Sequence, residues 1–350
     1  MQRPLLVTDR GLARMEITGR ALDVLEEAGL GRAIFAEVDP NPTGANLAAG
    51  CEAFRAGGHD GVVAFGGGSA LDLGKLAALM ANQTVSVWDL EDVDDWWTRA
   101  DADAIFPVVA VPTTAGTGSE VGRAGVLSNE ASHEKKIVFH PKIMPAVVIA
   151  DPELTVGMPP AITAGTGMDA FAHCLEAYCS PHYHPMSAGI AIEGMRLVLE
   201  NLERAYENPD DLDARADMMS AAMMGATAFQ KGLGAIHALS HPIGAVHGLH
   251  HGTTNAVVME PVLRFNRKAI QERIEQAAAY LGVAGGFEGF CERVTALNGA
   301  LGIPKNLTAL GVADPDVDAL VEAALRDPSV GGNPREMTRE NTTALLRSCL

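Results

Sequence analysis

The sequence predicts an α/β domain built on a parallel sheet, followed by a second domain made of helices. In residues 1–150, short β-branched runs alternate with helical stretches, which is typical of a parallel sheet covered by helices. After residue 152 the valine-rich runs nearly disappear, and long segments rich in Ala, Met and Leu continue to residue 350. A chain of 350 residues is also long enough for about two hydrophobic cores. We therefore expect a Rossmann-like domain over residues 1–152 and a helical domain over residues 153–350.

The elements of the first domain follow in order along the chain. Apolar runs predict strands at PLLVTD, AIFAEVD and GVVAFG, and helices are expected over residues 11–30, over residues 43–57 and at ALDLGKLAALMAN. The later runs FPVVAVPTT, KKIVFH and PAVVIAD are expected to extend or flank this sheet. The acidic stretch DLEDVDDWWTRADADA predicts a surface excursion. In the second domain, helical spacing is clearest over residues 185–206, 212–231 and 268–281.

Composition excludes several kinds of partner. A net charge of −18 without a basic patch argues against nucleic acid and anionic membranes. No apolar run approaches the roughly 18 to 20 residues of a membrane helix, and the start MQRPLLVTDRGL turns polar too soon for a secretory signal. Five scattered cysteines without a C-x-x-C pair argue against disulfides and against a thiolate metal site. We therefore expect a cytoplasmic protein.

Five of the eleven histidines fall within GAIHALSHPIGAVHGLHHG, residues 234–252. His237 and His241 lie four residues apart, so they share one face of a helix. Pro242 and Gly244 are expected to interrupt that helix. The chain then reaches three more histidines, which are His247, His250 and His251. One helix face and the loop after it could therefore converge on one point.

A second pair with the same spacing lies upstream in GMDAFAHCLEAY, where Asp169 and His173 stack on one helix face. Either pair alone is more often part of a hydrogen-bonded core, but the two together in one helical domain favour a metal site. A divalent metal with an open position needs three or four such ligands, and the set Asp169, His173, His237 and His251 would supply them. His241 would lie close by without being a ligand. Spacing does not decide between His250 and His251, and His182 and His184 are expected in a loop without a role.

A run of glycines marks the point where the strand VVAFG turns directly into a helix. Gly66, Gly67, Gly68 and Ser69 stand at this junction. Glycine allows the backbone to approach a pyrophosphate, whose charge the helix N-terminus then stabilises. A tight turn alone would not need three glycines. A P-loop ending at Gly74 and Lys75 fails because it would need Gly at position 69 and Ser or Thr at position 76. GTGMDA, residues 165–170, matches G-x-G-x-x-A but has no strand before it.

A second polar turn, VPTTAGTGSEV, follows another predicted strand. It offers the hydroxyls of Thr113, Thr114 and Thr117 at the carboxyl edge of the sheet, where open α/β sheets bind ligands; a plain surface loop is the alternative. Asp9 ends the first strand, LLVTD. A carboxylate there can accept a hydrogen bond from a ribose hydroxyl and would repel a 2′-phosphate, which favours NAD over NADP. These features predict that the first domain binds a dinucleotide.

At this point the chain resembles the iron-containing, group III alcohol dehydrogenase family over essentially its whole length. The motifs that carry the resemblance occur in the family's order: VTD, PNPT, GGGSALDLGK, VPTTAGTGSEV, DPELTVGMPP, GMDAFAHCLEAY, HALSHPIGA, HHGTTNAVVMEPVLRFN and NPREMT. Family members usually have a few tens of residues before the strand matched here by PLLVTD. Those residues include an edge strand pair, so the resemblance does not carry over to the sheet edge or to the dimer contact that this edge often supplies.

The resemblance implies a set of functional residues. It places iron on Asp169, His173, His237 and the histidine directly before Gly252, which is His251, and it places His241 near the reacting carbon. Besides Gly66 of the glycine turn, the implied cofactor contacts are Asp9, Asn41, Gly67, Gly68, Ser69, Thr113, Thr114, Thr117 and Lys135.

The implied activity is metal-dependent, NAD(P)-dependent transfer of hydride between a small alcohol and the nicotinamide, in either direction, by a homodimer. Iron is inferred from the family, since zinc generally outcompetes ferrous iron at such ligands. Two alternatives stay open: a metal-dependent lyase of the related dehydroquinate synthase architecture, and a protein that kept the fold without the chemistry. The four retained ligands argue against the latter. Maleylacetate reductases fit less well because they lack the acidic ligand that Asp169 supplies.

Overall fold

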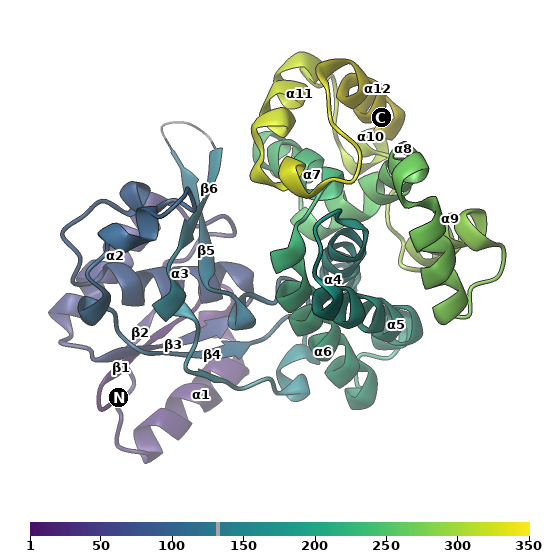
Figure 1. Cartoon of the computed structure of the whole chain (residues 1–350). Helices are drawn as coiled ribbons and strands as arrows, with labels where there is room; N and C mark the ends of the chain where they lie inside the picture. Colours follow the sequence, from purple (N-terminus) through teal and green to yellow (C-terminus); the bar gives the residue numbers. More distant parts are fainter. Residues whose placement is uncertain (131–133) are drawn as a thin grey trace. The chain divides into compact units, whose positions relative to one another are not determined.

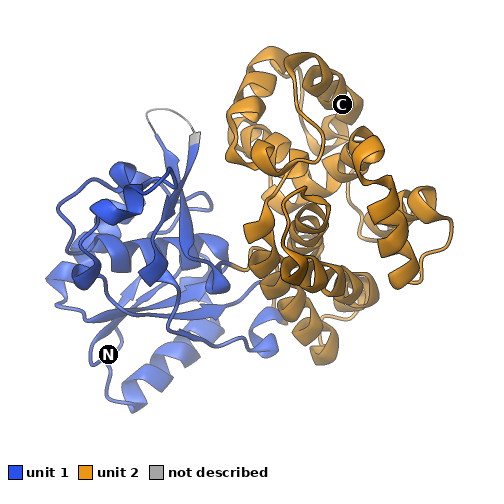
Figure 2. Cartoon of the chain, viewed as in Figure 1, with its two compact units in different colours: residues 1–114, 119–155 blue, residues 115–118, 156–350 orange. Residues whose placement is uncertain are grey.

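The computed structural model describes residues 1–130 and 134–350 and divides the chain into two compact units (Figures 1 and 2). The first unit comprises Met1–Thr114 and Ser119–Thr155, and the second comprises Ala115–Gly118 and Val156–Leu350. The predicted first domain, residues 1–152, includes the short segment 115–118. This segment instead packs with the helices, because Gly116 and Gly118 have no side chain: a Cβ on Gly116 would lie 2.7 Å from Cβ of Thr166.

A parallel sheet forms the centre of the first unit. Among the described residues it has five strands in the order β2-β1-β3-β4-β7. Their bounds are β1 Pro4–Val7, β2 Ile34–Phe35, β3 Gly61–Gly66, β4 Val108–Pro112 and β7 Val147–Val148. Leu6 of β1 pairs with Val63 of β3, which in turn pairs with Val109 of β4. The run AIFAEVD therefore forms a strand over only two residues, shorter than the sequence suggested.

Helices cover both faces of this sheet, as the alternation of strands and helices predicts. Helices α2 (Gly44–Ala56) and α3 (Gly68–Met80) pack on the face that contains Leu5 and Val62. Helix α1 (Glu16–Glu27) packs on the opposite face, which contains Leu6 and Val63. Successive strand residues point to opposite faces, so one short apolar strand serves both cores. Thr43 begins α2 with a reciprocal capping box to Asn46.

Two further segments flank the sheet without joining it. Strands β5 (Ala124–Asn129) and β6 (Glu134–Phe139) form a separate antiparallel pair, so KKIVFH flanks the main sheet. The acidic stretch forms short 3₁₀ turns at Val87–Leu90, Trp96–Arg99 and Ala102–Ala104. Most of its side chains are exposed or half-buried, as expected for a surface excursion.

The second unit is helical, which confirms the predicted fold class. Helix α4 (Pro160–Cys179) has every residue from 163 to 179 buried, because small and apolar residues surround it on all sides. It packs against α5 (Pro185–Glu207), α6 (Leu212–Ala228) and α8 (His251–Tyr280). The remaining helices are α7 (Ala235–His247), α9 (Gly286–Ala300), α10 (Leu307–Leu310), α11 (Val317–Arg326) and α12 (Arg339–Cys349). No helix in the described ranges is long and apolar enough to cross a membrane.

The expected break at Pro242 and Gly244 is wrong, because α7 continues through both residues to His247. Proline removes one backbone hydrogen bond from a helix. His237 and His241, which precede Pro242 in the helix, are each hydrogen-bonded to a carboxylate of another part of the chain. These tertiary contacts stabilise α7 where the proline removes a backbone hydrogen bond. Helix α7 ends at Gly248, whose φ of 64° is a left-handed conformation that glycine adopts without strain.

Candidate functional site

Asp169 and His173 of α4 meet His237 of α7 inside the helical unit. Each of these three buried side chains offers one ligand atom, and the atoms lie within 4.8 Å of one another. Oδ1 of Asp169 lies 3.7 Å from Nε2 of His173 and 3.7 Å from Nε2 of His237. Nε2 of His251 lies 3.4 Å from the same oxygen. A tetrahedral ion with bonds of about 2.1 Å separates its ligand atoms by about 3.4 Å. Asp169, His173 and His237 therefore fit around one divalent ion, and His251 lies against the same carboxylate oxygen.

A close approach of two helices brings His251 to Asp169. A Cβ on Gly252 would overlap the carbonyl oxygen of Gly165 in α4 and would lie 3.0 Å from Cβ of Asp169. Glycine at position 252 therefore lets α8 begin directly against α4, and His251 is the first residue of α8. The preceding His250 caps that helix, since its Nδ1 accepts a hydrogen bond from N of Thr253 at 3.3 Å. The structure thus places His251, and not His250, beside the carboxylate.

Burial and neighbouring charges set the electrostatics of this cluster. Burial by itself would raise the pKa of Asp169, but His173, His251 and His237 hold it well below its usual range. Burial lowers the pKa of His173 to about 4, although the nearby Asp169 opposes this. Burial would also lower the pKa of His237, but Glu176 and Asp169 together raise it to about 9. Asp169 is therefore an anion enclosed by imidazole rings, which suits the binding of a cation.

Two buried residues that were not predicted from the sequence contact the proposed ligands. Nδ2 of Asn255 donates to Oδ1 of Asp169 at 2.8 Å and lies 3.2 Å from Nε2 of His251. Oε2 of Glu176 lies 2.6 Å from Nδ1 of His237. Both residues carried a weak signal, since Glu176 is three residues after His173 and Asn255 is four residues after His251. Each therefore lies on the same helix face as a ligand.

His241 lies beside the ligand rings and is held from outside the cluster. Its ring stacks on that of His251, with centroids 5.3 Å apart and an angle of 15° between the planes. Its Nδ1 lies 2.8 Å from Oδ2 of Asp327, a residue that no local pattern marked. Burial would raise the pKa of Asp327, but the hydrogen bond and charge of His241 and the hydrogen bonds from Ser329 together outweigh burial, and the pKa is lowered. Nδ1 is thus the ring nitrogen that Asp327 engages.

The first unit has a cavity of about 330 Å³ at its glycine turn. Four residues predicted to bind cofactor line it, which are Asp9, Gly67, Gly68 and Ser69. Gly67 precedes the first turn of α3 and has no side chain, so the N–H groups at this helix end can bind a phosphate. Oδ1 of Asp9 accepts hydrogen bonds from N of Gly11 at 2.8 Å and from N of Leu12 at 2.9 Å. Arg10 and Asp39 also line the cavity, and neither was predicted from the sequence.

The other predicted cofactor residues do not line this cavity. N of Thr113 donates to the carbonyl of Gly66 at 3.0 Å, so the end of β4 is bonded to the glycine turn at the end of β3. Thr114 lies against Gly67, where a Cβ would come 3.3 Å from the Thr114 side chain. Three others lie elsewhere: Asn41 is exposed before α2, Thr117 belongs to the second unit, and Lys135 is on β6. Their part in cofactor binding stays a prediction.

A parallel-sheet unit with a cavity at its glycine turn, carried by the same chain as a carboxylate and imidazole metal centre, defines a class of protein. The class is that of the metal-dependent dehydrogenases, in which the fold positions a nicotinamide cofactor and a metal supplies the electrophile. Comparison with known proteins narrows this class to one family.

The model of the iron-containing alcohol dehydrogenases matches residues 1–152, and that of the C-terminal part of the Fe-containing alcohol dehydrogenase family matches residues 163–350. The chain belongs to the iron-containing alcohol dehydrogenase family, and it is an oxidoreductase that acts on CH–OH groups. This confirms the resemblance seen in the motifs. The alternative of a lyase finds no support, because the similar proteins are dehydrogenases and reductases.

Similar proteins cover the whole chain. It is 39% identical to a 4-hydroxybutyrate dehydrogenase of Cupriavidus necator over 360 residues, which covers 100% of this chain and 93% of that protein. It is 35% identical to a 1,3-propanediol dehydrogenase of Klebsiella pneumoniae, covering 99% of this chain and 91% of that one. The crystal structure of a 1,3-propanediol oxidoreductase superposes with a TM-score of 0.94 at 35% identity, covering 100% of this chain and 92% of that chain.

Proposed function

We propose that this enzyme is a metal-dependent, NAD-dependent alcohol dehydrogenase that interconverts small primary alcohols and their aldehydes. One observation carries the proposal: a carboxylate and three imidazoles converge within the reach of a single ion, with 3.4 to 3.7 Å between the Asp169 oxygen and the histidine nitrogens. Membership of the iron-containing alcohol dehydrogenase family supports the assignment of these groups to a metal that acts on an alcohol.

Asp169, His173, His237 and His251 would hold the metal. When bound, a divalent ion at this position supplies Lewis acidity to the substrate oxygen. The ligand set suits both ferrous iron and zinc, and zinc generally binds such ligands more tightly, so iron is proposed from the family and not from the ligands. Anaerobic purification followed by elemental analysis tests the metal. Zinc in place of iron would overturn the iron assignment and leave the site assignment intact.

His241 is the proposed acid and base. Asp327 holds its Nδ1, so Nε2 can take the proton of an alcohol during oxidation and return it to the oxygen during reduction. The ring is positioned by its stacking on His251, which ties proton transfer to the metal centre. The rest of the protein's work is placement of substrate and cofactor.

NAD is the proposed cofactor, bound along the glycine turn of the first unit. The pyrophosphate would lie at the N-terminus of α3, next to Gly67 and Gly68. Asp9 and Asp39 line the same cavity. They can accept hydrogen bonds from ribose hydroxyls and would repel the 2′-phosphate of NADP.

The substrate class is proposed from the relatives. Those named above are a 4-hydroxybutyrate dehydrogenase, a 1,3-propanediol dehydrogenase and a 1,3-propanediol oxidoreductase, whose names describe short linear alcohols with a second polar group. A screen of short alcohols, diols, hydroxy acids and aldehydes with metal-loaded protein, followed by NADH absorbance, tests the proposal. We expect reversible turnover with primary alcohols of about three to four carbons. Absence of net NADH formation with every substrate would contradict the activity.

A cytoplasmic homodimer completes the proposal. The five cysteines are buried as free thiols, which supports a reducing compartment. The dimer is proposed from the family alone. Light scattering of the purified protein should give about twice the chain mass of 36.7 kDa, and a mass of one chain would contradict it.

A further inference from the structure

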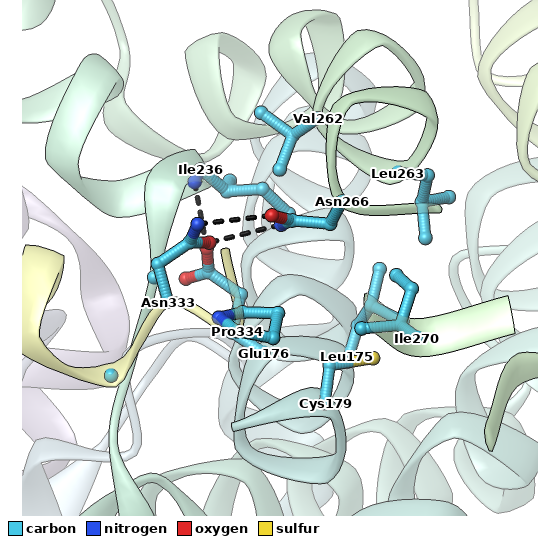
Figure 3. A pocket seen from close by; sticks show the side chains of 12 residues that line it. Leu175, Glu176, Cys179, Ile236, Val262, Leu263, Asn266, Ile270, Asn333 and Pro334 are labelled. Atoms are coloured by element: carbon cyan, nitrogen blue, oxygen red, sulfur yellow. Dashed lines mark hydrogen bonds between the residues drawn. The ribbon is translucent and has the colours of Figure 1, made fainter. Parts of the chain in front are cut away.

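Both oxygens of the buried Glu176 carboxylate contact the first turn of α7. Oε2 lies 2.6 Å from Nδ1 of His237, and Oε1 accepts a hydrogen bond from the backbone N of Ile236 at 2.7 Å. Glu176 lies on α4, 60 residues before Ile236 in the sequence (Figure 3). One side chain thus joins the helix that carries Asp169 and His173 to the helix that carries His237.

Helix α7 depends on such outside partners because its own cap position is Gly234. Glycine has no side chain to accept hydrogen bonds from the N–H groups of the first turn. Glu176 satisfies the N–H of Ile236, and Oδ1 of Asn333 satisfies the N–H of Ala235 at 3.1 Å. Asn333 is in turn held by a reciprocal pair of 2.9 Å hydrogen bonds with Asn266, which Figure 3 shows beside Glu176. Two side chains from distant parts of the chain therefore bind the N–H groups in the first turn of α7.

The two partners differ in what else they touch. Asn333 bonds to backbone groups and to Asn266, none of which is a proposed ligand. Glu176 also bonds to the imidazole of His237. A carboxylate can only accept, so Nδ1 of His237 carries the proton, and Nε2, on the side of Asp169, is left to bind a metal. Glu176 lines a cavity of only about 20 Å³ together with apolar residues such as Leu175 and Ile236. Little water therefore competes for its carboxylate.

We propose that Glu176 is a positioning residue for the metal centre: it fixes the ring and the tautomer of His237, and it couples metal affinity to the docking of α7. The inference rests on the proposed metal site, and it goes beyond it by assigning a role to a residue that is not a ligand. A purely structural reading would make Glu176 only a helix cap, equivalent to Asn333.

The variants Glu176→Gln and Asn333→Ala separate these two roles. In Glu176→Gln the amide oxygen can still cap Ile236, but the nearly isosteric side chain loses the charge that receives Nδ1–H. In Asn333→Ala a neighbouring cap is lost and His237 keeps its carboxylate. Binding of Co²⁺ alone to metal-depleted full-length protein is measured by competition with a chelator, alongside the melting temperature of the metal-free form and the visible spectrum of the Co²⁺ form.

We expect Glu176→Gln to weaken Co²⁺ binding by about 10- to 100-fold and to alter the Co²⁺ spectrum, with a small change in metal-free melting temperature. Asn333→Ala should lower the metal-free melting temperature and change Co²⁺ affinity by less than about threefold.

Wild-type Co²⁺ affinity in Glu176→Gln, or equal losses of affinity in both variants, would overturn the inference. If the wild-type protein itself binds no Co²⁺, the proposed metal site fails instead. If Asn333→Ala does not fold, the comparison of Glu176→Gln with wild type still decides.

Discussion

The carboxylate of Asp327 lies 2.8 Å from Nδ1 of His241, although 86 residues separate the two in the sequence. Asp327 also accepts a hydrogen bond from N of Ser329 at 2.8 Å, which fixes the start of the turn Pro328–Gly332. The aspartate is thereby held rigidly, and it holds the proposed acid and base in one orientation. This pair gives the first test of the site.

Replacing Asp327 by Asn should slow turnover while leaving the metal in place. The amide can still accept from Ser329, but its NH₂ group would face Nδ1 of His241 and favour the opposite tautomer. We expect kcat to fall by about 10²-fold, with an unchanged metal content and a melting temperature close to that of the wild type. Steady-state kinetics and elemental analysis check this. A variant with the wild-type kcat would show that the pair has no part in proton transfer.

Replacing His241 by Ala tests whether it acts on the substrate or on the metal. Loss of a general acid and base typically costs about 10²- to 10⁴-fold in rate. We expect a decrease in kcat of that size and retention of the metal, because the four proposed ligands do not include His241. Metal content and kcat are measured on the same preparation. If His241→Ala loses its metal, His241 is a ligand and its assigned role is wrong.

The sequence predicted those parts of the site that depend on local spacing. Asp169 and His173, like His237 and His241, share a helix face because four residues make about one turn, and this holds whatever surrounds the helix. The glycine turn before α3 was predictable for a similar reason, since its composition requires a close approach. The choice between His250 and His251 could not be made locally from the residues. It depends on where α8 begins, and that is fixed by its contact with α4 at Gly165.

Residues that act across long separations were missed. Asp327 stands 86 residues from His241, and nothing in its surroundings marks it. Glu176 shares a helix face with His173, but its helix is buried on all sides, so this face was not distinguished from the core. The expected break at Pro242 failed because tertiary hydrogen bonds hold α7 where the local rule predicts an interruption. Local sequence rules thus gave the proposed ligands, whereas the residues that contact them were found only in the structure.

The cofactor cavity predicts a change in specificity. Asp9 and Asp39 both line it, and Nη1 of Arg10 lies 4.0 Å from Oδ1 of Asp39. The double variant Asp9→Asn and Asp39→Asn removes two charges that would repel a 2′-phosphate and frees Arg10 to meet one. An interaction of about 1 to 2 kcal/mol corresponds to roughly a 10-fold change. We expect kcat/KM for NADP to rise by about that factor relative to NAD, and an unchanged ratio would exclude these carboxylates from cofactor selection.

The cysteines should be inert in the native protein. All five are buried, and burial raises the pKa of Cys51 and Cys291 to about 11 and that of Cys174, Cys179 and Cys349 to about 12. The thiolate is the reactive form, and it is scarce at pH 8 for such groups. We expect slow reaction with a thiol reagent in the native state and five reactive thiols in denaturant without reductant. Fast labelling of any native cysteine, or fewer than five thiols after denaturation, would contradict this.

The contact between Gly252 and Gly165 predicts that one methyl group can open the metal centre. A Cβ at position 252 would overlap the carbonyl oxygen of Gly165, a backbone atom that cannot rotate away. Gly252→Ala should therefore push α8 from α4, move His251 from Asp169 and weaken metal binding, with a loss of about 2 to 3 kcal/mol in the free energy of unfolding.

The matched control is Gly189→Ala in α5, where an added Cβ meets nothing within 4 Å. This variant should keep its metal affinity. Its melting temperature should be slightly higher, because alanine favours helix over glycine by about 0.5 to 1 kcal/mol. Thermal melts and Co²⁺ titrations of both variants check this. Equal behaviour of the two alanine variants would show that the approach of α8 to α4 does not set the position of His251.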